Sequence, residues 1–469
     1  MARIAILGAG GYAFPLRMVV DLLSFPELQA SEIVLMDIVA SRVNRTGRLA
    51  RDLVKTKKLP ARIVTTTSLE EALEGTAYVI VTWQVGGLEA YEPDVEIPRR
   101  YGIDQCVGDT HGPGGVFRFL RTWPAYMKVA EAMKRLCPDA LMINYANPMA
   151  MNCWGVNETG VKVVGLCHSV QGTSRMLAEM AGLDYDRCSF KCYGINHQAW
   201  FTEFRCGGRD VYDRVRKAMF AKFPSPVASG CGGKVAVAPG ASKLAVDHGD
   251  HYHQETVRTE IMRTFGYFHT ESSHHGSEYV AWFRKNPRLI KAYIRKRWDY
   301  LQLCRTIYTP EKERARVTEL LKSPLEASEE YGARIVHAME TDAKAVIYGN
   351  VPNYGPPGSV RQAPAAHLIG NLPQDCCVEV ACLVDRNGIQ PTSPGPLPSQ
   401  CAAMNLQHVA VQRLAVEAAQ TGDPMKVLQA VTMDPLTGAL LTLPQIRDMV
   451  RDLFAAHRKR LPQFKNVKL

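Results

Sequence analysis

The chain begins with RIAIL (3–7) and GAGGYA (8–13), an apolar run that leads directly into the pattern Gly-x-Gly-x-x-Ala. The following segment LRMVVDLL (16–23) has helical periodicity, so a strand, a turn and a helix are predicted in that order. Gly8 allows the tight turn, Gly10 lets a pyrophosphate approach the backbone, and the small Ala13 lets the helix pack on the strand. Together with Gly11, these residues predict a dinucleotide site in which the helix N-terminus faces the phosphates.

Asp37 ends the next predicted strand, 33–36, at the distance from the glycines where a carboxylate contacts the ribose in such sites. A carboxylate there accepts the ribose 2′-hydroxyl and repels a 2′-phosphate, so NAD is predicted over NADP. A Gly-rich turn in another kind of α/β protein is the alternative. The combination of strand, helix and acid disfavours it.

Three further predicted strands, 78–82, 140–145 and 163–166, end in polar residues, among them Gln84, Asn147 and the pair Cys167-His168. Ligands of parallel sheets bind at the carboxyl ends of the strands, so these residues are candidates for a site, with Gln84 nearest the cofactor. We expect an α/β protein in two parts, residues 1–195 and 196–469.

The first part, 1–195, is expected to be an NAD-binding, Rossmann-type doubly wound sheet like that of lactate and malate dehydrogenases. The second, 196–469, loses the βα alternation and has Pro-rich passages, including 352–364. It is expected to be an α+β domain for catalysis, substrate binding and oligomerisation.

Composition excludes several classes of protein. The 469 residues contain no apolar stretch near the roughly 20 residues that span a bilayer, and glycines interrupt the start where a signal peptide needs an apolar core. Thirteen irregularly spaced cysteines indicate reduced thiols in a cytoplasm. The net charge of +10 is scattered along the chain, which argues against nucleic acid and allows attraction of an anionic cofactor or substrate.

Cys167 and His197 are the first candidates for a metal site, since a thiolate and an imidazole suit a divalent transition ion. The spacing alone equally fits two core residues. Seven of the thirteen histidines lie between His197 and His275, and the sequence does not choose a ligand among them.

Longer motifs follow one another along the chain: GDTHGPGG (108–115), RFLRTWP (118–124), INYANPMAMNCW (143–154), VGLCHSVQGT (164–173), GINHQAW (194–200), GYFHTESS (266–273), SEYVAWF (277–283), CCVEVACLVD (376–385) and NGIQP (387–391). In their order and length they resemble the NAD- and manganese-dependent glycoside hydrolases of family 4. Within that family the chain is most similar to the melibiase-type α-galactosidases.

The resemblance implies a mechanism outside the usual pair of carboxylates, as for other NAD-dependent members of this family. NAD⁺ oxidises the sugar at C3, the ketone acidifies the C2 proton, and the aglycone leaves by elimination. Water then adds, and the retained NADH reduces C3 again. A divalent cation, Mn²⁺, held by the sugar's O2 and O3 stabilises the charge that develops.

The resemblance also implies roles for individual residues. Cys167 and His197 match the metal ligands, and Asn147 matches an asparagine that contacts the sugar hydroxyls. Asp109 and His168 are expected near the glycosidic oxygen, although other branches have an aspartate as general acid where this chain has His168.

The remaining candidates lie in two of the quoted motifs. Tyr267 and Glu271 are the candidates for the base that takes the C2 proton. Arg118 and Arg121 could pair with the carboxylate of a uronate substrate, but a structural role is the alternative for both.

The leading hypothesis is a cytoplasmic α-galactosidase that requires NAD and Mn²⁺, acts on small α-galactosides such as melibiose and forms a homodimer or homotetramer. An α-galacturonidase, α-glucuronidase or α-glucosidase with the same mechanism is the first alternative. An NAD-dependent hydroxy-acid dehydrogenase shares the fold and would accumulate NADH. A cofactor-holding protein that only binds another protein is disfavoured by the polar residues at the strand ends.

Overall fold

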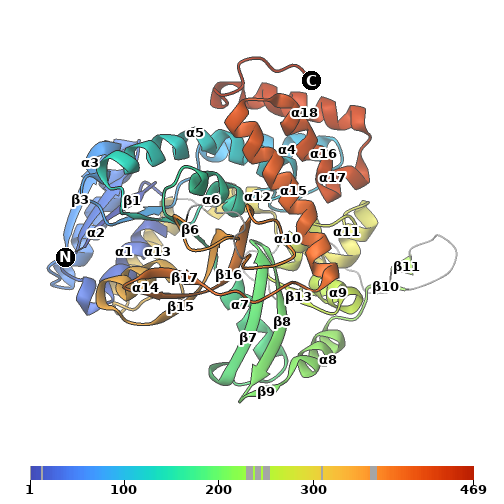
Figure 1. The fold of residues 1–469 in the computed structure, drawn as a ribbon, viewed down its shortest axis with the longest axis horizontal. Coiled ribbons are helices and arrows are strands. Elements are labelled where there is room, and N and C mark those ends of the chain that lie inside the picture. The colour runs from blue at the N-terminus through green and yellow to red at the C-terminus, as the bar shows by residue number, and fades with distance from the viewer. Residues whose placement is uncertain are drawn as a thin grey trace.

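The computed structural model describes residues 2–11, 14–228, 236–237, 245–246, 254–307, 310–359 and 367–469 (Figure 1). Ala13, the histidines at 248, 251 and 253, and part of the Pro-rich passage 352–364 lie outside these ranges. Within them, the cysteines are all free thiols. No helix in this part of the chain combines the length and the apolar character needed to cross a membrane.

A parallel sheet forms first, from β1 (Arg3–Leu7), β2 (Glu32–Met36), β3 (Arg62–Thr66), β4 (Tyr78–Val81), β5 (Leu141–Asn144) and β6 (Val163–Leu166). Its spatial order, β3-β2-β1-β4-β5-β6, is that of dinucleotide-binding sheets. The predicted Rossmann-type fold is confirmed. β3 was not predicted, because its residues RIVTT are mostly half-buried and give a weak apolar signal.

Helices cover both faces of this sheet, as its buried strands require. They are α1 (Phe14–Leu23), α2 (Ala40–Thr56), α3 (Leu69–Leu73), α4 (Gly87–Arg100), α5 (Gly112–Leu136), α6 (Met149–Glu158) and α7 (Ser169–Met180). One group joins α1 with α2 and α14 (Tyr331–Thr341), and another joins α5 with α3, α4 and α6.

The same sheet continues beyond β6 with antiparallel strands, added in the order β15 (Ala345–Pro352), β16 (Cys377–Asp385), β7 (Cys188–Ile195), β8 (Gln198–Cys206) and β13 (Phe268–His269). Figure 1 shows β7 and β8 as a long hairpin that leaves the parallel part. β7 lies within the predicted first part, which ends at 195, but it pairs antiparallel with strands of the second part, so the division of the chain at 195 stays a prediction.

Short strands complete the sheets: β9 (Arg209–Asp210) on β8, β17 (Gly388–Pro391) on β16, and the separate pairs β10 (Val227–Ala228) with β11 (Ala236–Val237) and β12 (Ala245–Val246) with β14 (Lys296–Arg297). The helices between them are α8 (Tyr212–Lys222), α9 (Thr256–Phe265), α10 (Ser273–Glu278), α11 (Pro287–Tyr293), α12 (Tyr300–Ile307) and α13 (Pro310–Lys322).

The C-terminal helices α15 (Ser399–Thr421), α16 (Pro424–Met433), α17 (Pro435–Leu440) and α18 (Leu443–His457) pack on one another and on α4 and α5 (Figure 1). Single 3₁₀ turns lie at Pro26–Leu28, Tyr185–Arg187 and Arg458–Arg460. The resulting α/β sheet with an α+β second part is the architecture that the sequence predicted.

Candidate active site

The glycine turn after β1 packs closely against neighbouring residues of the sheet edge. Gly8 has a φ of +84°, and a Cβ there would meet the backbone of Trp83 at 2.8 Å. A Cβ on Gly10 would lie 2.6 Å from Oδ2 of Asp37. These positions therefore accept only glycine, as the predicted approach of a pyrophosphate requires.

Asp37 lies against this turn. Its Oδ2 accepts the N–H of Gly10 at 3.0 Å and its Oδ1 accepts the N–H of Val39 at 2.9 Å. Gln84 follows β4, the neighbour of β1, and donates its side-chain amide to the carbonyl of Gly87 at 3.3 Å. The structure thus brings together Gly8, Gly10, Gly11, Asp37 and the end of β4 at one edge of the sheet.

Cys167, His197 and Glu271 form a second group of potential ligands, which we call the Cys–His–Glu cluster. Their donor atoms all lie within 4.8 Å of one another. Oε1 of Glu271 is 3.2 Å from Nε2 of His197 and 3.4 Å from Sγ of Cys167. One sulfur, one imidazole nitrogen and one carboxylate oxygen converge there, which is a donor set suited to a divalent transition ion.

Three separate elements supply the cluster. Cys167 follows β6, His197 is the second residue of the turn between β7 and β8, and Glu271 follows β13. The N–H of Thr270 donates to the carbonyl of Ala199 at 2.8 Å, which fixes the segment before Glu271 to β8. The long-range pairing of the antiparallel strands therefore builds the cluster.

The charges in the cluster favour a cation. Burial alone would raise the pKa of Glu271, but His197, His275 and His168 outweigh it and hold that pKa at about 2. Burial, and then the charge of Glu271, raises the pKa of the Cys167 thiol well above its usual range. A metal ion would have to displace the thiol proton on binding.

Tyr279 and His275 surround the cluster. The hydroxyl of Tyr279 lies 3.0 Å from Nδ1 of His197, so an N–H at Nδ1 that donates to it would leave Nε2 free for a metal. Nδ1 of His275 lies 3.4 Å from Oε2 of Glu271. Sequence reasoning missed Tyr279 because only the fold brings SEYVAWF beside His197.

Asp109 and Asn147 lie next to these groups. Nδ2 of Asn147 donates to Oδ2 of Asp109 at 3.1 Å, and Nε of Arg118 donates to the Asn147 carbonyl at 3.1 Å. Burial tends to raise the pKa of Asp109, but Arg118 and the histidines of the site outweigh it and keep that pKa below its usual range. Asp109 is therefore an anion that faces the same histidines as Glu271.

Glu278 holds the segment that carries Asp109. Its carboxylate accepts the backbone N–H groups of Val107 at 2.8 Å and Gly108 at 3.0 Å, and also that of Cys106. Burial raises the pKa of Glu278 to about 7. This buried contact spans 170 residues of sequence and has no local signal.

His168 lies between Cys167 and the first residue of α7, and its side chain is 69% exposed. Its Nδ1 lies 3.5 Å from Oε1 of Glu330. The hydrogen bond with Glu330 is the main reason that the pKa of His168 is raised. The site thus has an exposed imidazole one residue from Cys167.

Two predicted residues have other surroundings. The Arg121 side chain has no exposed surface, and its Nη1 lies 2.6 Å from Oδ2 of Asp94, so it joins α5 to α4 and is not available to a uronate. Tyr267 lies against the ring of Tyr212 on α8, at a centroid distance of 6.4 Å. Of the two candidates for the C2 base, the structure brings only Glu271 into the cluster.

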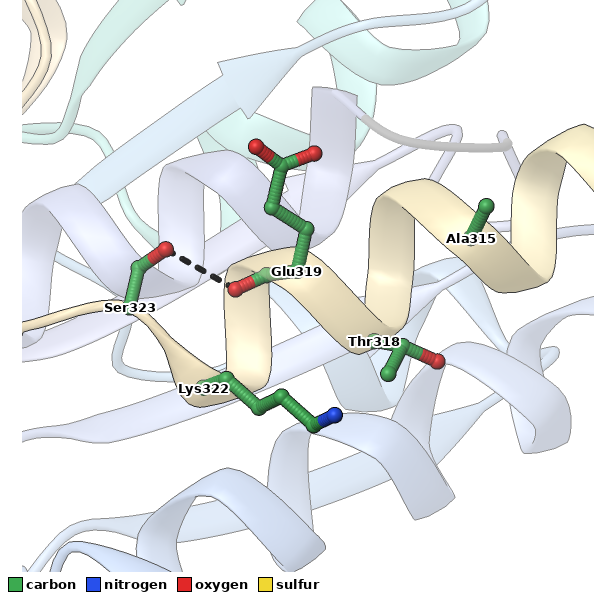
Figure 2. Close-up of a pocket in the computed structure, with 5 residues that line it drawn as sticks. All are labelled: Ala315, Thr318, Glu319, Lys322 and Ser323. Carbon is green, nitrogen blue, oxygen red and sulfur yellow. Dashed lines mark hydrogen bonds between the residues drawn. The ribbon is translucent and has the colours of Figure 1, made fainter.

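Two hollows lie apart from these groups. Figure 2 shows the larger, of about 570 Å³, on α13, where Ala315, Thr318, Glu319, Lys322 and Ser323 line it. The other, of about 380 Å³, lies between α6 and β15 and includes Trp154 and Tyr354. Neither is lined by a predicted site residue, so we assign the site from the side-chain geometry.

Comparisons with known proteins identify the family of the chain. The model of the "Family 4 glycosyl hydrolase" matches residues 3–183, and that of the "Family 4 glycosyl hydrolase C-terminal domain" matches residues 192–437. An α-galactosidase of Rhizobium meliloti is 37% identical over 98% of this chain and 89% of its own length. An α-galactosidase of Bacillus subtilis is 35% identical over 99% of this chain and its full length.

Solved structures share the fold. A 6-phospho-α-glucosidase from gut microorganisms, in complex with NAD and Mn²⁺, superposes with a TM-score of 0.77 at 18% identity and covers 99% of this chain and 100% of its own. The two family models together span most of the chain, and relatives above 30% identity cover nearly all of it. The chain therefore belongs to family 4 of the glycosyl hydrolases.

Proposed function

We propose that this protein is an α-galactosidase that requires NAD and Mn²⁺. The observation that carries the proposal is the Cys–His–Glu cluster after β6. It lies at the carboxyl-end edge of the sheet, as the glycine turn after β1 does. The names of the two relatives at 37% and 35% identity support the sugar specificity.

The glycine turn fits a dinucleotide. Gly8 and Gly10 provide the close approach, and the Asp37 carboxylate is placed to exchange its bond with Gly10 for one with a ribose hydroxyl. When bound, NAD⁺ supplies a hydride acceptor for the sugar C3 and returns the hydride at the end of the cycle. The solved relative with NAD supports this assignment.

The Cys–His–Glu cluster fits a divalent ion, with Sγ of Cys167, Nε2 of His197 and a Glu271 oxygen as ligands. When bound, the ion stabilises negative charge on the sugar oxygens. We propose Glu271 as a third ligand instead of the C2 base, because its Oε1 lies 3.2 Å from Nε2 of His197 and 3.4 Å from Sγ of Cys167.

Asn147, Asp109 and His168 are the proposed contacts of the sugar. The amide of Asn147 is held by Asp109 and its backbone by Arg118, so it presents a fixed hydrogen-bonding group to the sugar hydroxyls. His168 is the proposed general acid, since it is exposed beside the cluster and Glu330 favours its protonated form.

An α-galacturonidase is the second candidate, because of Arg118. This residue is 7% exposed, and its Nη1 has no hydrogen-bond partner among the described residues. A guanidinium with a free N–H in a buried position suits a carboxylate of a uronate. Asp109 lies near Arg118 and already balances its positive charge. The neutral galactoside is therefore the leading substrate.

A panel of 4-nitrophenyl glycosides tests the proposal. We expect turnover of the α-galactoside only with NAD⁺, Mn²⁺ and a thiol reductant together, at a rate above those of the α-galacturonide and α-glucoside. Preference for the α-galacturonide would select the second candidate. Accumulation of NADH in proportion to product would indicate a dehydrogenase.

The proposal includes a cytoplasmic location and a homodimer or homotetramer. Free thiols throughout the described ranges support a reducing compartment. Light scattering with size-exclusion chromatography measures the assembly, and a monomer would reject this part of the proposal.

A further inference from the structure

The segment Glu326-Ala327-Ser328-Glu329-Glu330, which we call the strap, connects α13 to α14 and crosses two helices of the site. On α1, Asp21 accepts the backbone N–H of Ser328 at 2.8 Å and its hydroxyl at 2.6 Å. Arg17 of α1 donates to the Glu326 carbonyl at 2.5 Å. The strap is therefore fixed to the helix that follows the dinucleotide turn.

The strap is also fixed to α7, the helix that His168 immediately precedes. Gln171 donates to the Glu329 carbonyl at 3.3 Å, and Arg175 donates to the Glu329 carboxylate at 2.7 Å. Beyond the strap, the N–H of Gly332 donates to the hydroxyl of Tyr145 at 2.8 Å, two residues before Asn147. The contacts made by the backbone of Ser328, Glu329 and Gly332 thus define the backbone position of Glu330.

Glu330 is the residue of the strap that reaches the site. Its side chain is 17% exposed, and its Oε1 lies 3.5 Å from Nδ1 of His168, whose side chain is exposed. Glu329, one residue earlier, pairs with Arg175 at the surface, where both side chains are about half exposed. The two neighbouring carboxylates therefore have different tasks.

We propose that Glu330 is a positioning residue for His168 in the departure of the aglycone. Its carboxylate accepts the Nδ1 proton and so fixes the ring with Nε2–H toward the glycosidic oxygen. In the elimination step, the C1–O bond breaks, its electron pair goes to the aglycone oxygen, and that oxygen takes the Nε2 proton. Water later restores this proton. The inference rests on the proposed function, with His168 as general acid.

The role of Glu330 also affects how the sugar intermediate that has lost its C2 proton divides between two reactions. Once C2 is deprotonated, the sugar either expels the aglycone or takes a proton back at C2. Without Glu330, expulsion of a poor leaving group slows while removal of the C2 proton does not. In D₂O, deuterium will then enter C2 of unreacted substrate before hydrolysis is complete.

The experiment compares Glu330→Ala with the matched control Glu329→Ala, using melibiose and 4-nitrophenyl α-galactoside in D₂O. For Glu330→Ala we expect hydrolysis of melibiose to fall about 10- to 100-fold, as for other residues that orient an acid–base group. Deuterium should appear at C2 of recovered melibiose. The nitrophenyl substrate, whose leaving group needs no proton, should change by less than about threefold. Glu329→Ala should behave as the wild type on both.

Equal falls of exchange and hydrolysis on both substrates, or no fall at all, would overturn the role of Glu330. NAD⁺ binding by the variants, followed by fluorescence, reports whether the strap still supports α1. A wild-type product without deuterium at C2 would overturn the proposed function as well. If the wild type prefers another α-glycoside, the same comparison on that glycone still decides the role of Glu330.

Discussion

Nε2 of His197 lies 3.2 Å from Oε1 of Glu271, and both residues have positive φ angles, 67° and 70°. Non-glycine residues rarely adopt this conformation, which costs of order 1–3 kcal/mol each. The fold places two such residues in contact with each other, at positions where glycine would adopt the backbone conformation at a lower energetic cost. This strain is consistent with a site in which the position of both side chains matters more than stability.

The first prediction concerns Cys167. As a metal ligand it must become a thiolate, so Cys167→Ser should bind Mn²⁺ poorly and keep nearly unchanged affinity for NAD⁺. As a simple core thiol, the same substitution would cost only about 1 kcal/mol of stability and no specific activity. Turnover across a Mn²⁺ titration, at saturating NAD⁺, separates the two. Superimposable curves for variant and wild type would reject the metal site.

Glu271→Gln tests the third ligand. The amide keeps the size of the side chain but removes the charge that offsets a cation, so the Mn²⁺ concentration for half-maximal activity should rise by at least about tenfold. Electron paramagnetic resonance of Mn²⁺ measures binding without turnover. Unchanged Mn²⁺ binding with loss of C2 exchange would instead make Glu271 the base.

Gly10→Ala tests the dinucleotide turn. The added Cβ would lie 2.6 Å from Oδ2 of Asp37 and 2.7 Å from Cβ of Arg42, so the turn must move. We expect the Kd for NAD⁺ to rise by at least about tenfold, with Mn²⁺ binding unaffected. Gly370→Ala, where a Cβ meets nothing within 4 Å, is the control. Equal Kd values for both variants would contradict the assignment.

The stability of the metal-free protein should depend on pH through His408. Burial lowers the pKa of this histidine to about 4, and its ring stacks on His111 at 4.1 Å. Below its unfolded pKa of about 6.5, the unfolded chain binds more protons than the folded one. The free energy of unfolding should therefore fall by up to about 3 kcal/mol as the pH falls from about 6.5 to about 4.

The variant His408→Gln should show a shallower loss over that window, measured by urea unfolding at several pH values. His337→Gln, at a half-buried position of α14 beside Glu27, serves as its control. An identical pH slope for His408→Gln and the wild type would show that this histidine does not contribute.

Arg121 has a structural role in this account. Arg121→Met leaves the buried Asp94 without its main partner and should cost about 3–5 kcal/mol of stability. Lys128→Met, at an exposed position of the same helix, should cost almost nothing. Residual folded enzyme should retain the KM of the wild type. A raised KM with unchanged stability would return Arg121 to the substrate site.

Local patterns sufficed to predict the parallel part of the fold. The glycine turn, Asp37 and the strands that end at Asn147 and Cys167 are each defined by a few neighbouring residues, and the structure contains them as predicted. The pairing of β15 with β6 could not be predicted in the same way, because β6 ends at Leu166 and β15 begins only at Ala345.

Residues of the candidate site could be predicted where their type and motif indicate a chemical role. They could not be predicted where only a tertiary contact gives them that role. Cys167 and His197 were candidates from their residue types, but Glu271 meets Cys167 across 104 residues of sequence. Tyr279, Glu278 and Glu330 act through backbone or side-chain partners that only tertiary structure brings near. The residues next to a glutamate or tyrosine in the sequence do not indicate that it has such a partner.

Hydrolysis of melibiose in D₂O, followed by NMR of the released galactose, tests the central claim most directly. With NAD⁺ and Mn²⁺ present, the account predicts deuterium at C2 of the product and no net formation of NADH. A galactose product with hydrogen retained at C2 would contradict it.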